Sequence, residues 1–192
     1  MLNNRKAETK HPVLEIIANR WSPYAFANTP VEKEKVMSLL EAARWAASSY
    51  NEQPWAYVVG FNGDENFKKL ASLLAEGNAW AKTVPVLMLS MAKKKFARNE
   101  KPNRHYMHDV GMASGFMALQ ATELDLAFHQ MAGFDVEKAI TECDMGEDYE
   151  PGAMIAIGYY GDQDALSDDL KGRETAPRAR KDMKDVLWKT EI

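Results

Sequence analysis

The segment at residues 48–54 (S-S-Y-N-E-Q-P) concentrates side chains that both donate and accept hydrogen bonds. It holds two hydroxyls, at Ser48 and Ser49, and two carboxamides, at Asn51 and Gln53. Groups of this kind, held between the end of a helix and the start of a strand, suit a polar, planar ligand. The same residue types are common in ordinary helix-to-strand turns, so the residues alone leave both interpretations open.

The segments on either side predict the elements that position this loop. Residues 29–32 (T-P-V-E) have the pattern of a capping box and predict a helix that runs to about Ala47. Pro54 ends any helix and favours an extended conformation at Gln53. The aromatic and β-branched residues 55–61 then predict a strand.

Three arginines suit an anionic ligand. Arg20 follows a predicted short helix at residues 11–19, and Arg178 and Arg180 occupy alternate positions near the other end of the chain. In an extended backbone, alternate side chains point the same way. Guanidinium groups carry a permanent charge and a fork of donors that matches phosphate. Solvated surface positions explain the same arginines equally simply, and the residues alone do not decide.

Composition limits the class of protein. The chain has 192 residues, 46% of them hydrophobic, which predicts one domain spanning residues 1–192. The formal net charge of −4 argues against nucleic-acid binding as the main role. Cys143 is the one cysteine, so no intramolecular disulfide forms. We find no signal-peptide pattern and no apolar run near the roughly 20 residues of a membrane span, so we expect a cytoplasmic protein.

Two polar clusters permit further interpretations. His105, His108 and Asp109 lack another partner at a metal-ligand spacing, so we expect no metal site. Residues 93–104 carry six cations and one acid, Glu100. A solvated loop explains this basic run, and so does a docking patch for the phosphates of a nicotinamide dinucleotide or another anionic substrate.

The remaining pattern predicts helices and strands that alternate without simple βαβ winding. Gly111 and Gly115 lie four apart in the longest helical pattern, which makes sense if another helix crosses closely. Asp64 and Asp135 are predicted to cap the helices that follow them. The other predicted helices span residues 106–126, 136–143 and 181–188, and the other predicted strands span residues 84–89 and 151–160.

Residues 48–59 (S-S-Y-N-E-Q-P-W-A-Y-V-V) resemble the S-x-x-N-x-Q-P-W-x-[FY]-x-V signature of the nitroreductase family of FMN-dependent oxidoreductases. Arg20, Ser22 and Phe26 match that family's R-x-S-x-[RK]-x-F element, in which Tyr24 replaces a usual Arg or Lys. Residues 126–135 are similar to a later family segment that ends in Gly-Phe, with Asp125 where the family usually has Gly. The matches extend in order from about Arg20 to Arg180.

The resemblance implies an α+β fold, with a central, mostly antiparallel sheet flanked by helices, in a homodimer that holds FMN at the subunit interface. It implies hydride transfer from NADH or NADPH through flavin N5 to a nitroaromatic, quinone or enone in a ping-pong mechanism, with no catalytic side chain. Ala132 and Gly133 are implied as backbone donors to the flavin edge, and Asn78 either contacts the flavin or caps a helix. A flavin-binding storage or regulatory protein of the same fold is the alternative. The implied FMN-binding residues are Arg20, Trp21, Ser22, Ser48, Ser49, Asn51, Gln53, Asn78, Met131, Ala132, Gly133, Arg178 and Arg180.

Overall fold

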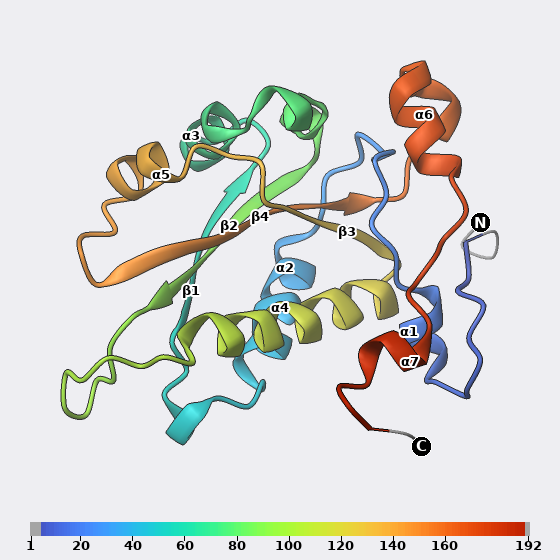
Figure 1. The fold of residues 1–192 in the computed structure, drawn as a ribbon. Helices are drawn as coiled ribbons and strands as arrows, with labels where there is room; N and C mark the ends of the chain where they lie inside the picture. The colour runs from blue at the N-terminus through green and yellow to red at the C-terminus, as the bar shows by residue number, and fades with distance from the viewer. Residues whose placement is uncertain (1–4, 191–192) are drawn as a thin grey trace.

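A computed structural model describes residues 5–190, and within them four strands form one antiparallel sheet (Figure 1). The strands lie in the order β1-β2-β4-β3. Strand β2 and strand β4 occupy the centre, and Met88 pairs with Ile155 between them. The strand bounds are β1 Trp55–Phe61, β2 Val86–Lys93, β3 Leu126–Met131 and β4 Tyr149–Tyr159.

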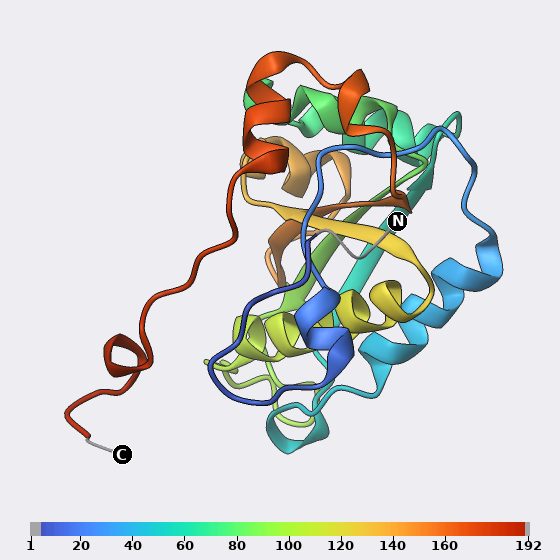
Figure 2. The same ribbon diagram turned by 90° about the vertical axis from the view of Figure 1, so that its right-hand side faces the viewer.

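Helices cover both faces of this sheet, so the mixed α+β fold with an antiparallel sheet is confirmed (Figures 1 and 2). The α-helices are α1 Glu15–Asn19, α2 Lys33–Arg44, α3 Glu65–Leu73, α4 Tyr106–Glu123, α5 Val136–Glu142, α6 Asp168–Thr175 and α7 Met183–Val186. Short 3-10 helices are η2 Ser49–Asn51, η3 Glu76–Thr83 and η4 Gln163–Ala165.

The core consists of two layers, one on each side of the sheet. Helices α2 and α4 pack with Met88 and Ile155 on one face, whereas α3 and α5 pack with Leu87 and Met154 on the other. Neighbouring residues of a strand alternate between the two layers because strand side chains alternate in direction. Both faces are therefore apolar, which explains the nearly continuous hydrophobic run of β2.

Two predicted helices begin later than expected. Helix α2 starts at Lys33, and the predicted capping box at residues 29–32 is wrong. The Glu32 carboxylate, the acid of the predicted box, accepts a hydrogen bond from the Tyr159 hydroxyl at 2.7 Å, and Val31 is buried in the core before the helix begins. Helix α1 starts at Glu15 rather than at residue 11, since it buries only Ala18. Too little apolar contact is present to extend it further.

The caps at Asp64 and Asp135 are confirmed. The Asp64 carboxylate accepts from the Phe67 amide at 2.7 Å, and the Asp135 carboxylate accepts from the Lys138 amide at 2.9 Å. Both acceptors satisfy an amide that the first turn of a helix leaves without an intrahelical partner. These two helices therefore begin where the sequence indicated.

The C-terminal segment leaves the body of the molecule after α6, a helix that the sequence did not predict. Buried Glu174 of α6 accepts a hydrogen bond from the Tyr24 amide at 2.7 Å and ties the two ends of the chain together. Figure 2 shows the following segment running away from the sheet. Helix α7 is shorter than the predicted helix at residues 181–188. In the described part of the chain, no helix is both long and apolar enough to cross a membrane.

Candidate functional site

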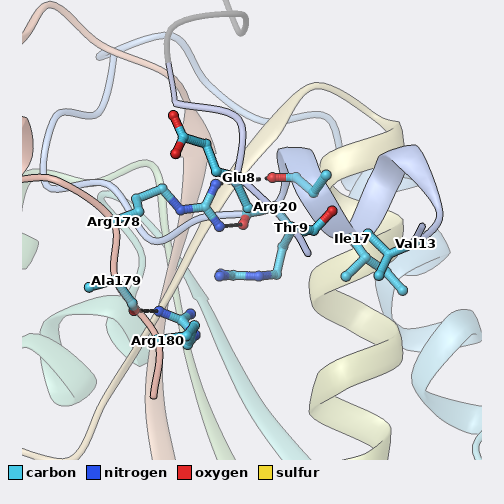
Figure 3. A pocket seen from close by; sticks show the side chains of 10 residues that line it. Glu8, Thr9, Val13, Ile17, Arg20, Arg178, Ala179 and Arg180 are labelled. Carbon is cyan, nitrogen blue, oxygen red and sulfur yellow. Dashed lines mark hydrogen bonds between the residues drawn. The ribbon is translucent and has the colours of Figure 1, made fainter. Parts of the chain in front are cut away.

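The three arginines from opposite ends of the sequence meet at one cavity. Arg20, Arg178 and Arg180 line a pocket of about 270 Å³, which we call the arginine pocket (Figure 3). Burial is the main cause that lowers the pKa of Arg20, and the neighbouring charge of Arg180 lowers it further. Because a guanidinium is a permanent cation in proteins, three positive charges meet at this pocket. An anion would relieve their mutual repulsion. The other lining residues are Ala7, Glu8, Thr9, Val13, Ile17, Ala18 and Ala179.

Arg178 builds the pocket more than it faces into it. Its Nη2 donates to the Arg20 carbonyl at 2.8 Å, and its Nη1 donates to the carbonyls of Ala18, at 3.0 Å, and Arg5. These bonds fasten the C-terminal segment to the chain around α1. Arg20 and Arg180 are therefore the cations whose donors are better placed for a ligand.

An apolar groove runs along the outer side of α4 and adjoins the arginine pocket. Its volume is about 770 Å³, within the range of small-molecule and cofactor sites. Ile17 and Arg20 line both cavities, so a cationic pocket and an apolar surface meet at Arg20. Such a pair suits a ligand with an anionic end and a flat apolar body. The groove is lined by Ile17, Arg20, Ser22, Met107, His108, Gly111, Met112, Gly115, Phe116, Ala118, Leu119, Phe128 and Gln130.

The polar loop at residues 48–53 forms its own hydrogen-bond system. Ser48 Oγ accepts from the Gln53 amide at 2.9 Å, and Gln53 Nε2 donates to the Asn51 carbonyl at 3.0 Å. Tyr50, Asn51 and Gln53 have φ values of 54°, 57° and 53°. The extended conformation predicted for Gln53 is wrong, because Ser48 holds its amide on the inside of the turn. Left-handed non-glycine residues cost of order 1–3 kcal/mol each and concentrate at functional sites.

Helix α4 fixes this loop to the body. The buried Asp109 carboxylate accepts from the Ser49 amide at 3.0 Å. The sequence suggested Asp109 only as a possible metal ligand, and no pattern in the sequence pairs it with Ser49. Neither the arginine pocket nor the α4 groove is lined by a residue of the loop. One chain therefore does not bring the loop and the arginines to a common cavity.

The residues next to Arg20 divide between the groove and the body. Ser22 lines the groove, and its Oγ accepts from Arg20 Nη1 at 3.3 Å. Trp21 stacks on Tyr160 with ring centroids 6.0 Å apart and does not line either cavity. Tyr24, which replaces a cation of the family pattern, packs its ring against Trp80 and His129. Tyr24 therefore adds no charge to the arginine pocket.

The segment after β3 is held from the side opposite the groove. The Gly133 carbonyl accepts from Asn78 Nδ2 at 2.9 Å and from the Ala75 amide at 3.1 Å. A Cβ at Gly133 would lie 2.7 Å from Asn78 Nδ2, so a larger residue would displace the Asn78 carboxamide. Met131 is buried in the layer of α3 and α5, whereas Ala132 is exposed. Asn78 thus holds the peptide that follows Gly133.

Strand β3 contributes alternate residues to the groove. Phe128 and Gln130 line it, whereas His129 points to the other face and its Nδ1 lies 2.7 Å from the Pro23 carbonyl oxygen. Burial lowers the pKa of His129, so this imidazole is neutral at physiological pH. No motif in the sequence marked Phe128 or Gln130 as lining residues. On α4, the spacing of His108, Met112 and Phe116 places these groove residues on one face of the helix, and this is the signal that could have found them.

Comparisons with known proteins identify the family of this chain. A sequence model described as the nitroreductase family matches residues 17–86. A 15.4 kDa protein of Mycolicibacterium smegmatis is 32% identical over 140 residues, which cover 69% of this chain and 93% of that protein. The chain belongs to the nitroreductase family. A Streptomyces coelicolor member named NADH dehydrogenase/NAD(P)H nitroreductase is 28% identical, over 71% of this chain and 77% of its own length.

A solved structure extends the likeness to the whole nitroreductase fold. The crystal structure of an oxidoreductase containing FMN is 33% identical and superposes with a TM-score of 0.91, covering 100% of this chain and 98% of its own. The family match at residues 17–86 includes Arg20 and the loop at residues 48–53. Helix α4, strand β3 and the two C-terminal arginines lie outside that match, and the structure places them around the same groove and pocket.

Proposed function

We propose that this protein is an oxidoreductase that uses FMN to transfer hydride from NADH or NADPH to a small electrophilic acceptor. The observation that carries the proposal is Arg20, which lines both the arginine pocket and the apolar α4 groove. FMN combines a phosphate with a planar, largely apolar ring system, and this pair of adjoining cavities matches both parts. The similar oxidoreductase that contains FMN supports the same cofactor.

The fit assigns a task to each group of residues. Arg20 and Arg180 would hold the phosphate, and Arg178 would keep their backbone in place. Ser22 would add a hydroxyl beside Arg20. Trp21 and Met131 would support the site from behind, since the structure turns both side chains away from the groove.

The flavin edge would contact backbone and carboxamide groups. The amides of Ala132 and Gly133 are the proposed donors, in a segment that Asn78 holds. Ser48, Ser49, Asn51 and Gln53 would contact the same ring. Donors that are fixed in advance stabilise developing negative charge without reorganisation, and the strained loop is fixed in this way.

We propose that the loop reaches the flavin from a second copy of the chain. Adding a Cβ at Gly111 or Gly115 would meet nothing within one chain, so these glycines leave room for a partner helix. Met112 and Phe116 beside them are each 40% exposed, and Trp188 in the C-terminal segment is 83% exposed. Met112 and Phe116 lie together at the groove, where a partner subunit would cover them.

When bound, FMN supplies a two-electron acceptor and donor, so that the nicotinamide and the acceptor use the site in turn in a ping-pong mechanism. No side-chain acid or base is assigned. The protein would orient the reactants and exclude water through the groove and the partner subunit. Nitroaromatics, quinones and enones are the proposed acceptors, and the proposed protein is a single-domain cytoplasmic homodimer.

The visible spectrum of the purified protein tests the proposal. We expect flavin bands that bleach when NADPH or NADH is added without oxygen and return when a quinone or nitroaromatic follows. Bands that persist would point to a flavin-binding storage or regulatory protein, and a protein that stays colourless with added FMN would overturn the proposal. Arg20→Gln should weaken FMN binding at least tenfold, whereas Lys82→Gln, an exposed cation on η3, should not.

A further inference from the structure

A basic hairpin beside the polar loop has no role in the function proposed above. Within residues 94–103, the Asn103 amide donates to the Lys94 carbonyl at 2.8 Å, and the Phe96 amide donates to the Lys101 carbonyl at 2.9 Å. Lys95 and Pro102 form an isolated bridge. The predicted basic run is therefore an ordered hairpin, which we call the basic hairpin, and its tip carries Arg98 and Lys101.

The basic hairpin is attached to the loop at residues 48–53. The Ala97 amide donates to Glu52 Oε1 at 2.7 Å, and the Lys93 amide donates to the Pro54 carbonyl at 2.8 Å. At the tip, the Arg98 guanidinium carbon lies 4.4 Å from the centre of the Tyr50 ring. Whatever contacts the loop therefore also lies near the tip of the hairpin.

The charges of the hairpin divide into a paired base and an unpaired tip. Lys95 forms an ion pair with Asp148 at 2.9 Å. The hydrogen bond from Lys95 lowers the pKa of Asp148 most, and the charges of Lys93 and Lys94 lower it further. In the part of the chain that the structure describes, Arg98 and Lys101 form no ion pair. Two acids lie nearby, Glu52 and Glu100, and the Glu52 carboxylate is already engaged by the Ala97 amide.

Arg98 is held in advance of any ligand. Its guanidinium packs over the rings of Tyr50, at 4.4 Å, and Phe96, at 5.4 Å, which themselves meet edge to face at 5.8 Å. Tyr50 is 76% exposed, so one side of this arrangement is open to solvent. A stacked guanidinium loses less entropy when it binds a phosphate than a free one does. The stacking therefore fixes the position of the Arg98 guanidinium at the tip before any anion binds.

We propose that Arg98 and Lys101 bind the ribose 2′-phosphate of NADPH and give this protein a preference for NADPH over NADH. The inference rests on the proposed function, in which the nicotinamide reaches a flavin beside the loop at residues 48–53. The flavin phosphate is assigned to the arginine pocket, so the hairpin is available for the donor. The two dinucleotides share their pyrophosphate, and only the extra phosphate of NADPH can discriminate between them.

Calorimetric titration of the purified protein with 2′,5′-ADP and with 5′-AMP tests the site without activity. We expect 2′,5′-ADP to bind at least tenfold more tightly, and the difference to shrink about tenfold in the double variant Arg98→Ala/Lys101→Ala. The difference in affinity should also shrink when the salt concentration rises from about 50 to about 300 mM, because salt screens exposed charges. Lys82→Ala, the matched exposed cation on η3, should keep the wild-type difference.

Steady-state kinetics sharpens the result. In the flavin-loaded protein, the ratio of kcat/KM for NADPH to that for NADH should fall about tenfold in the double variant. Arg98→Lys keeps the charge and loses the planar group that stacks on Tyr50, so its ratio should lie between those of the wild type and the double variant. Equal binding of the two nucleotides, or an equal loss with both donors, overturns this inference and leaves the flavin proposal intact. Protein that lacks flavin but still prefers 2′,5′-ADP would overturn the proposed function alone.

Discussion

The arginine pocket and the loop at residues 48–53 are built in opposite ways. The loop is largely local, because Ser48, Asn51 and Gln53 bond to one another, while Asp109 and the basic hairpin hold it from outside. The pocket joins residues about 160 positions apart, and Arg178 holds the junction through three backbone carbonyls. The loop contains residues with a strained backbone, whereas the pocket brings the like charges of Arg20 and Arg180 close together.

This difference explains how one ligand could use both regions. The strained loop, held to α4 by Asp109, can present its groups outward to another molecule as one preformed unit. A pocket made from both ends of a chain needs that chain to be folded first. Neither cavity includes a loop residue, and this separation is the basis for the proposed site between two subunits.

The largest expected effect comes from separating the two regions. In Gly115→Glu, an unpaired charge would enter the proposed interface, and we expect dimerisation to weaken about 100-fold, together with loss of FMN. Analytical ultracentrifugation and the visible spectrum measure both. The matched control is Gly172→Glu in α6, where an added Cβ likewise meets nothing. A Gly115→Glu protein that stays dimeric and yellow would contradict the two-subunit site.

Removing the junction should break the pocket and spare the loop. Arg178→Ala deletes the bonds to the carbonyls of Arg5, Ala18 and Arg20, and we expect the free energy of unfolding to fall by about 2 kcal/mol. Urea denaturation measures this loss. Arg178→Lys should recover only part of it, because an ammonium group lacks the planar fork. Unchanged stability in Arg178→Ala would show that the three bonds contribute nothing.

Removing Asp109, which holds the loop to α4, should disturb the loop and leave the arginine pocket intact. Asp109→Ala leaves the Ser49 amide without its acceptor, and we expect a loss of about 1–2 kcal/mol of stability with weaker FMN binding. Asp109→Asn keeps an oxygen at the same place and serves as the control. Thermal unfolding and flavin titration provide the two readouts. If Asp109→Ala binds FMN as tightly as the wild type does, Asp109 does not contribute to the FMN site.

The smallest effect separates functional strain from ordinary strain. Asp125 follows the C-terminus of α4 with φ of 57°, a position that favours glycine. Asp125→Gly should raise the free energy of unfolding by about 1 kcal/mol and leave FMN binding unchanged. Asn51→Gly, with the same φ, should relieve similar strain but weaken FMN binding. Equal flavin affinity in both variants would show that the carboxamide of Asn51 is not used.

Several elements could be predicted because their causes are local. Asp64 and Asp135 cap their helices because a carboxylate reaches an amide three residues away. The strand at residues 55–61 follows from its own composition and matches the observed bounds. The capping box at residues 29–32 failed because the Glu32 carboxylate bonds to a distant partner, the Tyr159 hydroxyl. The conformation of Gln53 was predicted wrongly for a different reason, since a local bond from its amide to the Ser48 hydroxyl overrides the preference set by Pro54.

The sequence alone determined the residues of the polar loop and the set of arginines that carry charge, and its resemblance to the nitroreductase family implied the antiparallel α+β class. Residue chemistry and short-range spacing decide the first two features, and both can be read directly. Only the tertiary structure decided that Arg20 joins two cavities, that Arg178 is a fastening rather than a free cation, and that Asp109 holds Ser49. These contacts connect residues 60 to 173 positions apart, and their partners are chosen by packing rather than by spacing.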